Sequence, residues 1–338
     1  MTETLWNAAR HHWELAAAKC EVKRSAIEVA GQRINLEFAG GPLSAVLLPP
    51  LAHVLVDFGP NPDLTISAWD SASTGVGFPV ATRDARLRIP AWRLGESTEE
   101  VPLTGMRVID QQVEGALGIL TDSQAVFWTQ DVSTFPAWER AQPMLHLLHW
   151  WFATRGLQVV HAGAFGRNGK GVIIVGPSGS GKSTTALSAA ASGMDYIGDD
   201  RILIDPGPPP RALHLYASAK LLRPAQGAIA RMLPPIANPD RTGDDKALYL
   251  LDSGVVPSIE IVAVVAPKLT GDRNATLDRI TAVEALSAMA PSSIVGTPGA
   301  GARAFSLMRN LCSSLPCFRL RLGSPESVPA AFEELLAC

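Results

Sequence analysis

The chain has 338 residues, which is more than one small domain usually contains and predicts two domains. Hydrophobic residues make up 47% of the sequence, enough to build a sizeable core. The formal net charge of -3 and a pI near 6.2 leave no basic footprint, so a nucleic-acid partner is not expected.

The cysteines give no sign of a metal site, because the four of them form no C-x-x-C pair and no Cys/His cluster of zinc spacing. We expect free thiols in a reducing compartment. The first residues are neither basic nor followed by an apolar core, which argues against a signal peptide. No apolar run approaches the ~20 residues that span a bilayer. A cytoplasmic protein without a membrane partner is therefore expected.

Residues 1–138 alternate between apolar and polar positions in the manner of β-strands, which predicts a mostly β accessory domain. A short helix is expected at residues 6–19. The β-like segments are residues 25–38 (two strands around a turn), 63–69, 85–94 and 106–128. No catalytic constellation is visible in this domain.

An α/β domain is predicted for residues 139–338, where strand-like and helix-like segments follow one another. The expected helices are residues 144–154, 184–191, 281–289, 305–315 and a last one from 324. The expected strands are residues 157–162, 171–175, 196–204, 213–222, 259–265 and 317–322. Thr281 and Glu284 form a capping box, and residues 291–301 are predicted to be a loop. His146 and His149 share a helix face without further ligands, so core histidines are favoured over a metal site.

The segment from Gly176 to Ser183 fits the phosphate-binding pattern G-x-x-x-x-G-K-[ST] between an apolar strand and a helix. Its glycines allow backbone N–H groups to turn toward phosphate oxygens, and the helix points its positive end at the same anion. Lys182 can neutralise the β- and γ-phosphates of ATP, and the Ser183 hydroxyl can bind Mg²⁺. The expected nucleotide-binding residues are Gly176, Pro177, Ser178, Gly179, Ser180, Gly181, Lys182, Ser183 and Thr184. The alternative, a glycine-rich turn without a ligand, is disfavoured by both flanks.

Asp199 and Asp200 lie seventeen and eighteen residues beyond Lys182 in an apolar segment. Adjacent carboxylates in such a setting are costly to bury unless they are paired or bound to a metal. Because successive strand residues face opposite ways, one can accept a proton from a hydroxyl while the other binds Mg²⁺. The alternative is a strand-end turn with solvated carboxylates. Taken alone, His161 would be a core residue at the end of the strand before the loop strand, and Arg201 has no assigned role.

Three features taken together resemble the catalytic domain of HPr kinase/phosphorylase and its bacterial serine-kinase relatives. They are the segment from His161 to Ala164, the phosphate loop and the aspartate pair. The resemblance covers about residues 140–338. It implies a P-loop kinase fold shared with phosphoenolpyruvate carboxykinases, ATP and Mg²⁺ as cofactors, and a homo-oligomer. It also implies a catalytic group of Lys182, Asp199, Asp200 and His161. In this group Asp199 is the base that receives the serine proton, Asp200 joins Ser183 at the metal, and His161 lies beside them.

The sequence departs from that family downstream of the aspartates. HPr kinases carry a signature with a carboxylate metal ligand, whereas the stretch from Ser218 to Pro224 contains no carboxylate, which argues against HPr as the substrate. Lys220, Arg223 and Lys246 are candidate phosphate contacts, with a solvated surface charge as the alternative for each. We expect an ATP-dependent kinase acting on a serine-like hydroxyl of a small protein, a peptide or a small molecule. The alternatives are a nucleotide-binding regulator or ATPase switch, and an interaction protein that keeps the loop as a scaffold.

Overall fold

A computed structural model describes the chain at residues 2–78, 89–90, 105–111, 115–222, 229, 233–240, 246–295 and 301–337. The chain divides into two compact units, residues 1–155 and residues 156–338. Both units combine helices with mixed β-sheets, so the chain is a mixed α/β protein. The sequence analysis expected the boundary at residue 138, whereas residues 139–155 lie within the first unit.

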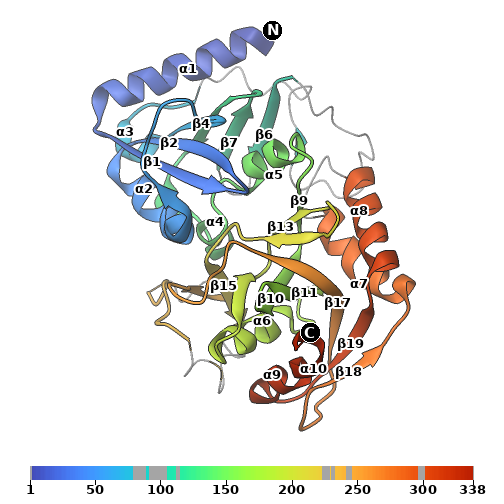
Figure 1. Ribbon diagram of the computed structural model, residues 1–338. Helices are drawn as coiled ribbons and strands as arrows, with labels where there is room; N and C mark the ends of the chain where they lie inside the picture. Colours follow the sequence, from blue (N-terminus) through green and yellow to red (C-terminus); the bar gives the residue numbers. More distant parts are fainter. Residues whose placement is uncertain are drawn as a thin grey trace. The chain divides into compact units, whose positions relative to one another are not determined.

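The described part of the first unit is built on one sheet and several helices (Figure 1). The strands are β1 (Val22–Val29), β2 (Gln32–Ala39), β3 (Leu55–Val56), β4 (Leu64–Asp70), β5 (Ile89–Pro90), β6 (Arg107–Gln111), β7 (Ala116–Leu120) and β8 (Gln124–Thr129). Their order in the sheet is β3-β1-β2-β4-β8-β7-β6-β5. The helices are α1 (Thr2–Lys19), α2 (Gly41–Leu47), α3 (Ser71–Thr74), α4 (Ala137–Ala141) and α5 (Leu145–Ala153), with 3-10 helices at Pro49–Val54 and Val132–Thr134.

The predicted secondary structure of this unit is largely confirmed. The helix expected at 6–19 is α1, and the two strands expected in 25–38 are the antiparallel pair β1 and β2. The segment 63–69 is β4, and 106–128 contains β6, β7 and most of β8. The strand predicted at 85–94 lies outside the described residues, except for the two that form β5.

Helices α1 and α5 cover opposite faces of the first sheet. Successive strand residues point to opposite faces, and in β7 Leu117 and Ile119 join the apolar cluster beneath α1. Between them, Gly118 lies against Leu147 of α5, where an added Cβ would come within 2.9 Å of the leucine Cδ2. The missing side chain lets α5 approach the sheet closely. This packing explains why the buried helix predicted at 144–154 belongs to the first unit.

In the second unit, the described strands are β9 (Gln158–Val160), β10 (Ala162–Arg167), β11 (Lys170–Val175), β12 (Asp195–Gly198), β13 (Ile202–Asp205), β14 (Arg211–Leu213), β15 (Ser218–Leu222), β16 (Lys246–Leu250), β17 (Ser258–Leu269), β18 (Thr276–Arg279) and β19 (Cys317–Leu322). The helices are α6 (Lys182–Ala191), α7 (Ala282–Val295), α8 (Gly301–Ser314), α9 (Val328–Ala331) and α10 (Glu333–Leu336), with a 3-10 turn at Pro325–Ser327. The main sheet has the order β12-β10-β11-β17-β14-β13-β9, with β19 paired to β17 and β18 to β19. Strands β15 and β16 form a separate antiparallel ribbon.

The main sheet lies between two layers of helices (Figure 1). In β11, Ile173 and Val175 pack in a cluster with α7 and α8. The alternate residues Val172 and Ile174 pack in a second cluster with α6 and the C-terminal helices. Because β11 is buried on both faces and paired on both edges, the end from which the candidate loop departs is rigidly held.

Two predicted strands are each broken at a predicted site residue. The segment 157–162 divides into β9 and β10 with His161 between them, and 196–204 divides into β12 and β13 with residues 199–201 between them. Strand β10 pairs with β12, whereas β9 pairs with β13, so the two breaks face each other. The expectation of uninterrupted strands is therefore wrong at these points, because each half pairs with a different partner.

Helix α7 begins where the capping box predicted. The Thr281 N–H donates to Glu284 Oε2 at 2.9 Å, and the Glu284 N–H donates to Thr281 Oγ1 at 3.3 Å. The helix continues through Pro291 to Val295, so the loop expected from residue 291 is wrong for its first five residues. The additional turn brings two serines, Ser292 and Ser293, to the candidate site.

Candidate functional site

The candidate loop connects the end of β11 to the first residue of α6. Gly179 and Gly181 have φ angles of 80° and 103°, in the region that favours glycine. A Cβ at Gly181 would lie 2.5 Å from Leu322 Cδ2 of β19, so this position also has no room for a side chain. Pro177, Ser178 and Gly179 at the tip of the loop are exposed. The backbone therefore makes turns at Gly179 and Gly181 that only glycine adopts easily, and the phosphate-binding role of the loop stays a prediction.

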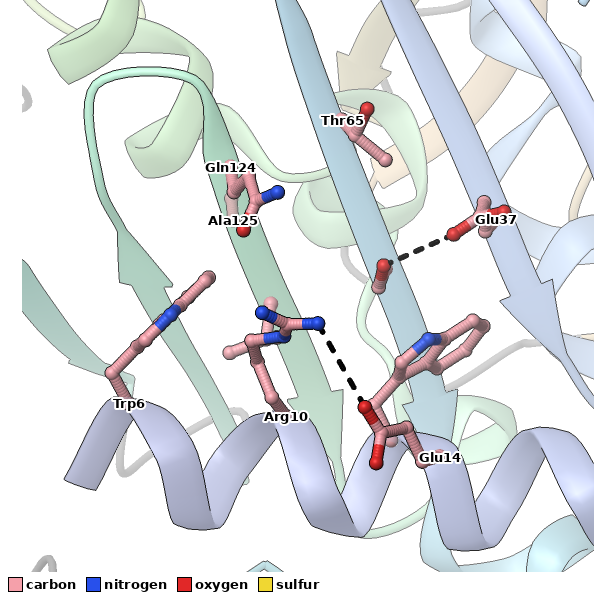
Figure 2. Close-up of a pocket in the computed structure, with 10 residues that line it drawn as sticks. Trp6, Arg10, Glu14, Glu37, Thr65, Gln124 and Ala125 are labelled. Atoms are coloured by element: carbon pink, nitrogen blue, oxygen red, sulfur yellow. Dashed lines mark hydrogen bonds and ion pairs between the residues drawn. The ribbon is translucent and has the colours of Figure 1, made fainter. Parts of the chain in front are cut away.

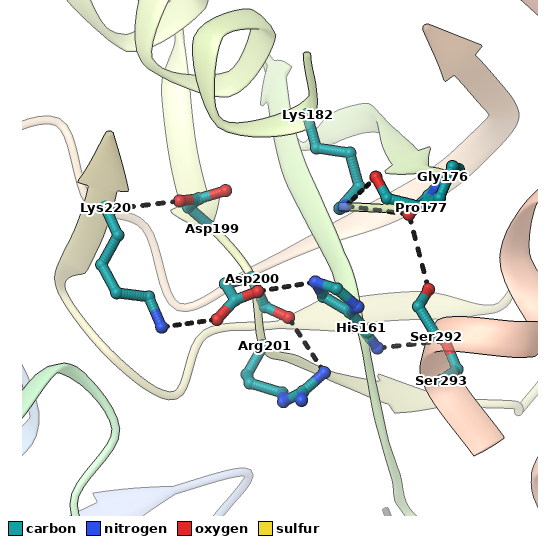
Figure 3. Close-up of polar contacts among 10 residues, drawn as sticks. All are labelled: His161, Gly176, Pro177, Lys182, Asp199, Asp200, Arg201, Lys220, Ser292 and Ser293. Carbon is teal, nitrogen blue, oxygen red and sulfur yellow. Dashed lines mark hydrogen bonds and ion pairs between the residues drawn. The ribbon is translucent and has the colours of Figure 1, made fainter. Parts of the chain in front are cut away.

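Lys182 folds back over this loop. Its Nζ donates to the carbonyl oxygens of Gly176 at 2.8 Å and Pro177 at 3.0 Å, and its side chain is buried. Burial lowers the pKa of Lys182, while Asp200 and Asp199 act in the opposite direction. The ammonium group thus stands at the mouth of the loop, within electrostatic reach of both aspartates (Figure 3).

The aspartate pair sits in a tight turn and not within a strand. The Arg201 N–H donates to the Asp199 carbonyl at 2.8 Å, and the residue between them, Asp200, has a φ of 69°. This is the hydrogen-bond pattern of a γ-turn, a conformation that non-glycine residues rarely adopt. Such local strain is found where the surrounding structure holds a functional side chain in a required direction.

Both carboxylate oxygens of Asp200 bind cationic or donor groups (Figure 3). Oδ1 lies 2.6 Å from His161 Nε2, and Oδ2 lies 2.7 Å from Lys220 Nζ. Burial would raise the pKa of Asp200, but Lys220, the His161 hydrogen bond and Arg201 together hold that pKa well below its usual value. Asp200 is therefore an ionised, firmly held carboxylate.

Asp199 has a different environment, with only 2% of its surface exposed. Oδ2 accepts the Lys220 backbone N–H at 3.3 Å, whereas Oδ1 is buried without a hydrogen-bond partner. Burial and repulsion by Asp200 raise the pKa of Asp199 to about 6, although the Ser183 hydroxyl and the Lys220 N–H act against that rise. Ser183, the first hydroxyl of α6, thus interacts with Asp199. The sequence analysis grouped Ser183 with Asp200 as metal ligands, which stays a prediction, whereas the interaction that the structure gives Ser183 is with Asp199.

The last turn of α7 fixes two of these groups. Ser293 Oγ accepts the His161 backbone N–H at 3.1 Å, and Ser292 Oγ donates to the Gly176 carbonyl at 3.4 Å. Burial lowers the pKa of His161 despite its hydrogen bond with Asp200, so the imidazole is neutral at pH 7. The sequence analysis identified neither serine as a site residue, because it predicted a loop where α7 continues for a further turn.

The candidate phosphate-binding cations have different settings. Lys220 is neither a solvated charge nor a solvent-facing contact, because it is buried against Asp200. Lys246 lies close enough to Lys182 to lower the pKa of that lysine, and Arg223 lies outside the described residues. The guanidinium of Arg201 adds positive charge near His161 and Asp200, and its Nε is buried without a partner.

A pocket of about 180 Å³ lies in the first unit, between α1 and the sheet (Figure 2). Trp6 and Trp13 of α1 form part of its wall, and Ser67 donates to Glu37 at 3.3 Å on the sheet side. Arg10 of α1 also lines it. None of the predicted site residues lines this pocket, so it is separate from the chemistry described above.

Within the described ranges, no helix is both long and apolar enough to cross a membrane. These ranges also contain no group of three or more His, Cys, Asp or Glu side chains placed to hold a metal ion. Cys20, Cys312 and Cys317 are free thiols, as expected, and Cys338 lies outside the described residues.

No model of a known protein family matches this chain, and no curated protein matches it. The solved structures that match include the HPr(Ser) kinase/phosphatase from Coxiella burnetii. That match has a TM-score of 0.29 and 15% sequence identity, and it covers 53% of this chain and 88% of the other.

Proposed function

We propose that the second unit is an ATP-dependent phosphotransferase that phosphorylates a serine-like hydroxyl of a small protein or peptide. The observation that carries this proposal is the meeting of three groups in one place. These are the loop lysine Lys182, the buried Asp199 with one unpartnered oxygen, and the ionised Asp200 held by His161. Phosphoryl transfer depends mainly on positioning and on neutralising charge, which is what such a constellation supplies.

The loop fits the phosphates of a nucleotide. Its glycine conformations and the N-terminus of α6 suit an anion, and Lys182 has its ammonium group at the loop mouth. In the nucleotide complex, Lys182 would exchange the carbonyl oxygens of Gly176 and Pro177 for phosphate oxygens. Lys246 would add a second positive charge near the same place.

We assign the two aspartates roles that differ from the sequence expectation, with Asp199 at the metal and His161, held by Asp200, as the proton acceptor. Asp199 and Ser183 would hold Mg²⁺, because they interact with each other and because Asp199 Oδ1 is a buried oxygen that lacks a partner. When bound, Mg²⁺ neutralises charge that develops on the phosphate oxygens during transfer.

The Asp200–His161 pair would orient the acceptor hydroxyl. The side chains of Asp200 and His161 are 20% and 14% exposed, so an acceptor can reach them more readily than it can reach Asp199. His161 is neutral at pH 7, because burial lowers its pKa, and it can take up the hydroxyl proton. Asp200 would hold the imidazole and stabilise its charged form, as carboxylates paired with histidine do.

The direct test is transfer of label from [γ-³²P]ATP to proteins or serine peptides in the presence of Mg²⁺. The wild-type chain should label an acceptor at serine, and Lys182→Met should label about tenfold less or lower still, because it loses both nucleotide affinity and the charge that faces the phosphates. Lys268→Met, at an exposed position of β17, is the matched control and should behave as wild type. Absence of labelled acceptor from cell extract and peptide pools, with no nucleotide bound, would refute the proposal.

The single variants Asp199→Asn and Asp200→Asn test which aspartate holds Mg²⁺ and which one acts through His161. Asp200→Asn should keep Mg²⁺-dependent nucleotide binding and lose most transfer, whereas Asp199→Asn should weaken that binding itself. The opposite pattern would overturn the assignment while leaving the kinase proposal in place.

A regulator or ATPase switch is the second candidate, and the composition of β15 favours it. That strand carries Lys220 and no carboxylate. A switch would release inorganic phosphate from ATP without labelling any acceptor, so the same experiment separates the two functions.

A further inference from the structure

Lys220 contacts both aspartates at once. Its ammonium group lies 2.7 Å from Asp200 Oδ2, and its backbone N–H donates to Asp199 Oδ2 at 3.3 Å. The Lys220 side chain is only 6% exposed, so the charge pair is largely removed from water. A buried pair of this kind persists only with good geometry and additional hydrogen bonds, and both are present here.

The position of Lys220 is set by the strand that carries it. Ala219 and Leu221, on either side in β15, pack in a cluster with Leu187 of α6. Because neighbouring strand residues point to opposite faces, Lys220 is directed away from that cluster and toward Asp200. Tyr196, fully buried in β12, donates its hydroxyl to the Ser218 carbonyl at 3.1 Å and so holds the start of β15 beside the aspartates.

The four carboxylate oxygens of the aspartate pair differ in what they contact. Asp200 Oδ1 contacts His161, Asp200 Oδ2 contacts the Lys220 ammonium, and Asp199 Oδ2 accepts the Lys220 N–H. Asp199 Oδ1 is the one buried oxygen of the pair without a partner among the described residues. A divalent cation at Asp200 would have to displace Lys220 or lie beside a like charge, which is unfavourable in a buried site.

We propose that the Lys220 ammonium is a built-in counter-ion for Asp200 and that the site holds a single divalent cation, on the Asp199 and Ser183 side. This inference rests on the proposed nucleotide-binding function, which it deepens by fixing the number of metal ions. A covalently attached charge here would keep Asp200 ionised and oriented at any Mg²⁺ concentration.

The experiment counts Mn²⁺ bound per chain by electron paramagnetic resonance, with the full chain saturated by AMP-PNP. Wild type and Lys220→Arg should each bind one Mn²⁺. Lys220→Met leaves Asp200 without its counter-ion and should bind two. The double variant Lys220→Met/Asp200→Asn should return to one, because the second ion would depend on Asp200.

A count of two in the wild type would overturn the inference. So would a count of one in a Lys220→Met variant whose circular dichroism matches the wild type. If that variant does not fold, the wild-type and Lys220→Arg counts still decide whether one ion or two is bound. Failure of AMP-PNP to bind the wild type would instead refute the proposed function, and the inference with it.

Discussion

Replacing Asp199 by asparagine should stabilise the protein at pH 7, because the folded chain holds this carboxylate ionised at a cost. Burial and repulsion by Asp200 raise its pKa from 3.8 to about 6. A shift of about two units at 1.36 kcal/mol each corresponds to about 3 kcal/mol of lost stability above pH 6. The asparagine side chain would keep an oxygen acceptor for the Lys220 N–H without the charge.

The sign of the pH dependence follows from linkage. Between the unfolded pKa and the folded one, the folded chain binds more protons at Asp199, so the wild type loses stability as pH rises through that window. Below pH 3.8 the carboxyl group is protonated in both states and the cost disappears. The advantage of Asp199→Asn should therefore be near zero at about pH 3.5 and reach about 3 kcal/mol at pH 7.

Urea denaturation of the full chain can resolve this effect, since the aromatic residues are divided between the units. All eight tryptophans lie in residues 1–155, and all three tyrosines lie in residues 156–338. The tyrosines Tyr196, Tyr216 and Tyr249 are almost fully buried. Asp199→Asn should shift the transition followed by tyrosine absorbance to a higher urea concentration.

The matched control is Asp278→Asn, at an exposed position of β18, which should change stability by less than about 0.5 kcal/mol. Equal stabilisation by Asp199→Asn at the acid and neutral pH values, or destabilisation at pH 7, would refute the reasoning from burial and charge.

Three further predictions concern the loop and the elements around it. Gly181→Ala should unfold at lower urea and bind ATP analogues at least about tenfold more weakly, as measured by denaturation and calorimetry, because its φ and the leucine beside it leave no room for a methyl group. Thr281→Ala should cost about 1 kcal/mol of stability by removing the capping box with Glu284, and an unchanged urea midpoint would contradict this. Ser293→Ala should slow transfer about fivefold in a labelling assay by loosening His161, with nucleotide affinity unchanged, as expected for a lost hydrogen bond of about 1 kcal/mol.

The sequence predicted most elements of the fold, because long amphipathic segments and apolar strands have clear periods. It did not predict the breaks at His161 and at the aspartate pair. Both segments are continuously apolar around the break, and periodicity cannot show that the two halves pair with different strands. The alternative kept for Asp199 and Asp200, a turn at a strand end, describes their backbone better than a continuous strand does, although Asp199 is buried and Asp200 is only 20% exposed.

The position of Lys220 could have been suspected from the sequence. A single lysine within an apolar strand must find a partner, since an unpaired buried charge is very costly. Asp199 and Asp200 were carboxylates in an apolar segment that also needed a partner. Ser292 and Ser293, in contrast, gave no signal, because Pro291 suggested that the helix had already ended.

The parallel pairing around β11 has a consequence for how the protein is made. Strand β11 leads into the loop, yet its parallel neighbour β17 comes much later in the chain, and β19 follows later still. Strand β19 also supplies Leu322, which lies against Gly181. The loop sequence therefore leaves the ribosome well before the strands that hold it, and long-range parallel pairing is slow to form. The proposed nucleotide site should therefore be among the last parts of the second unit to form during its synthesis.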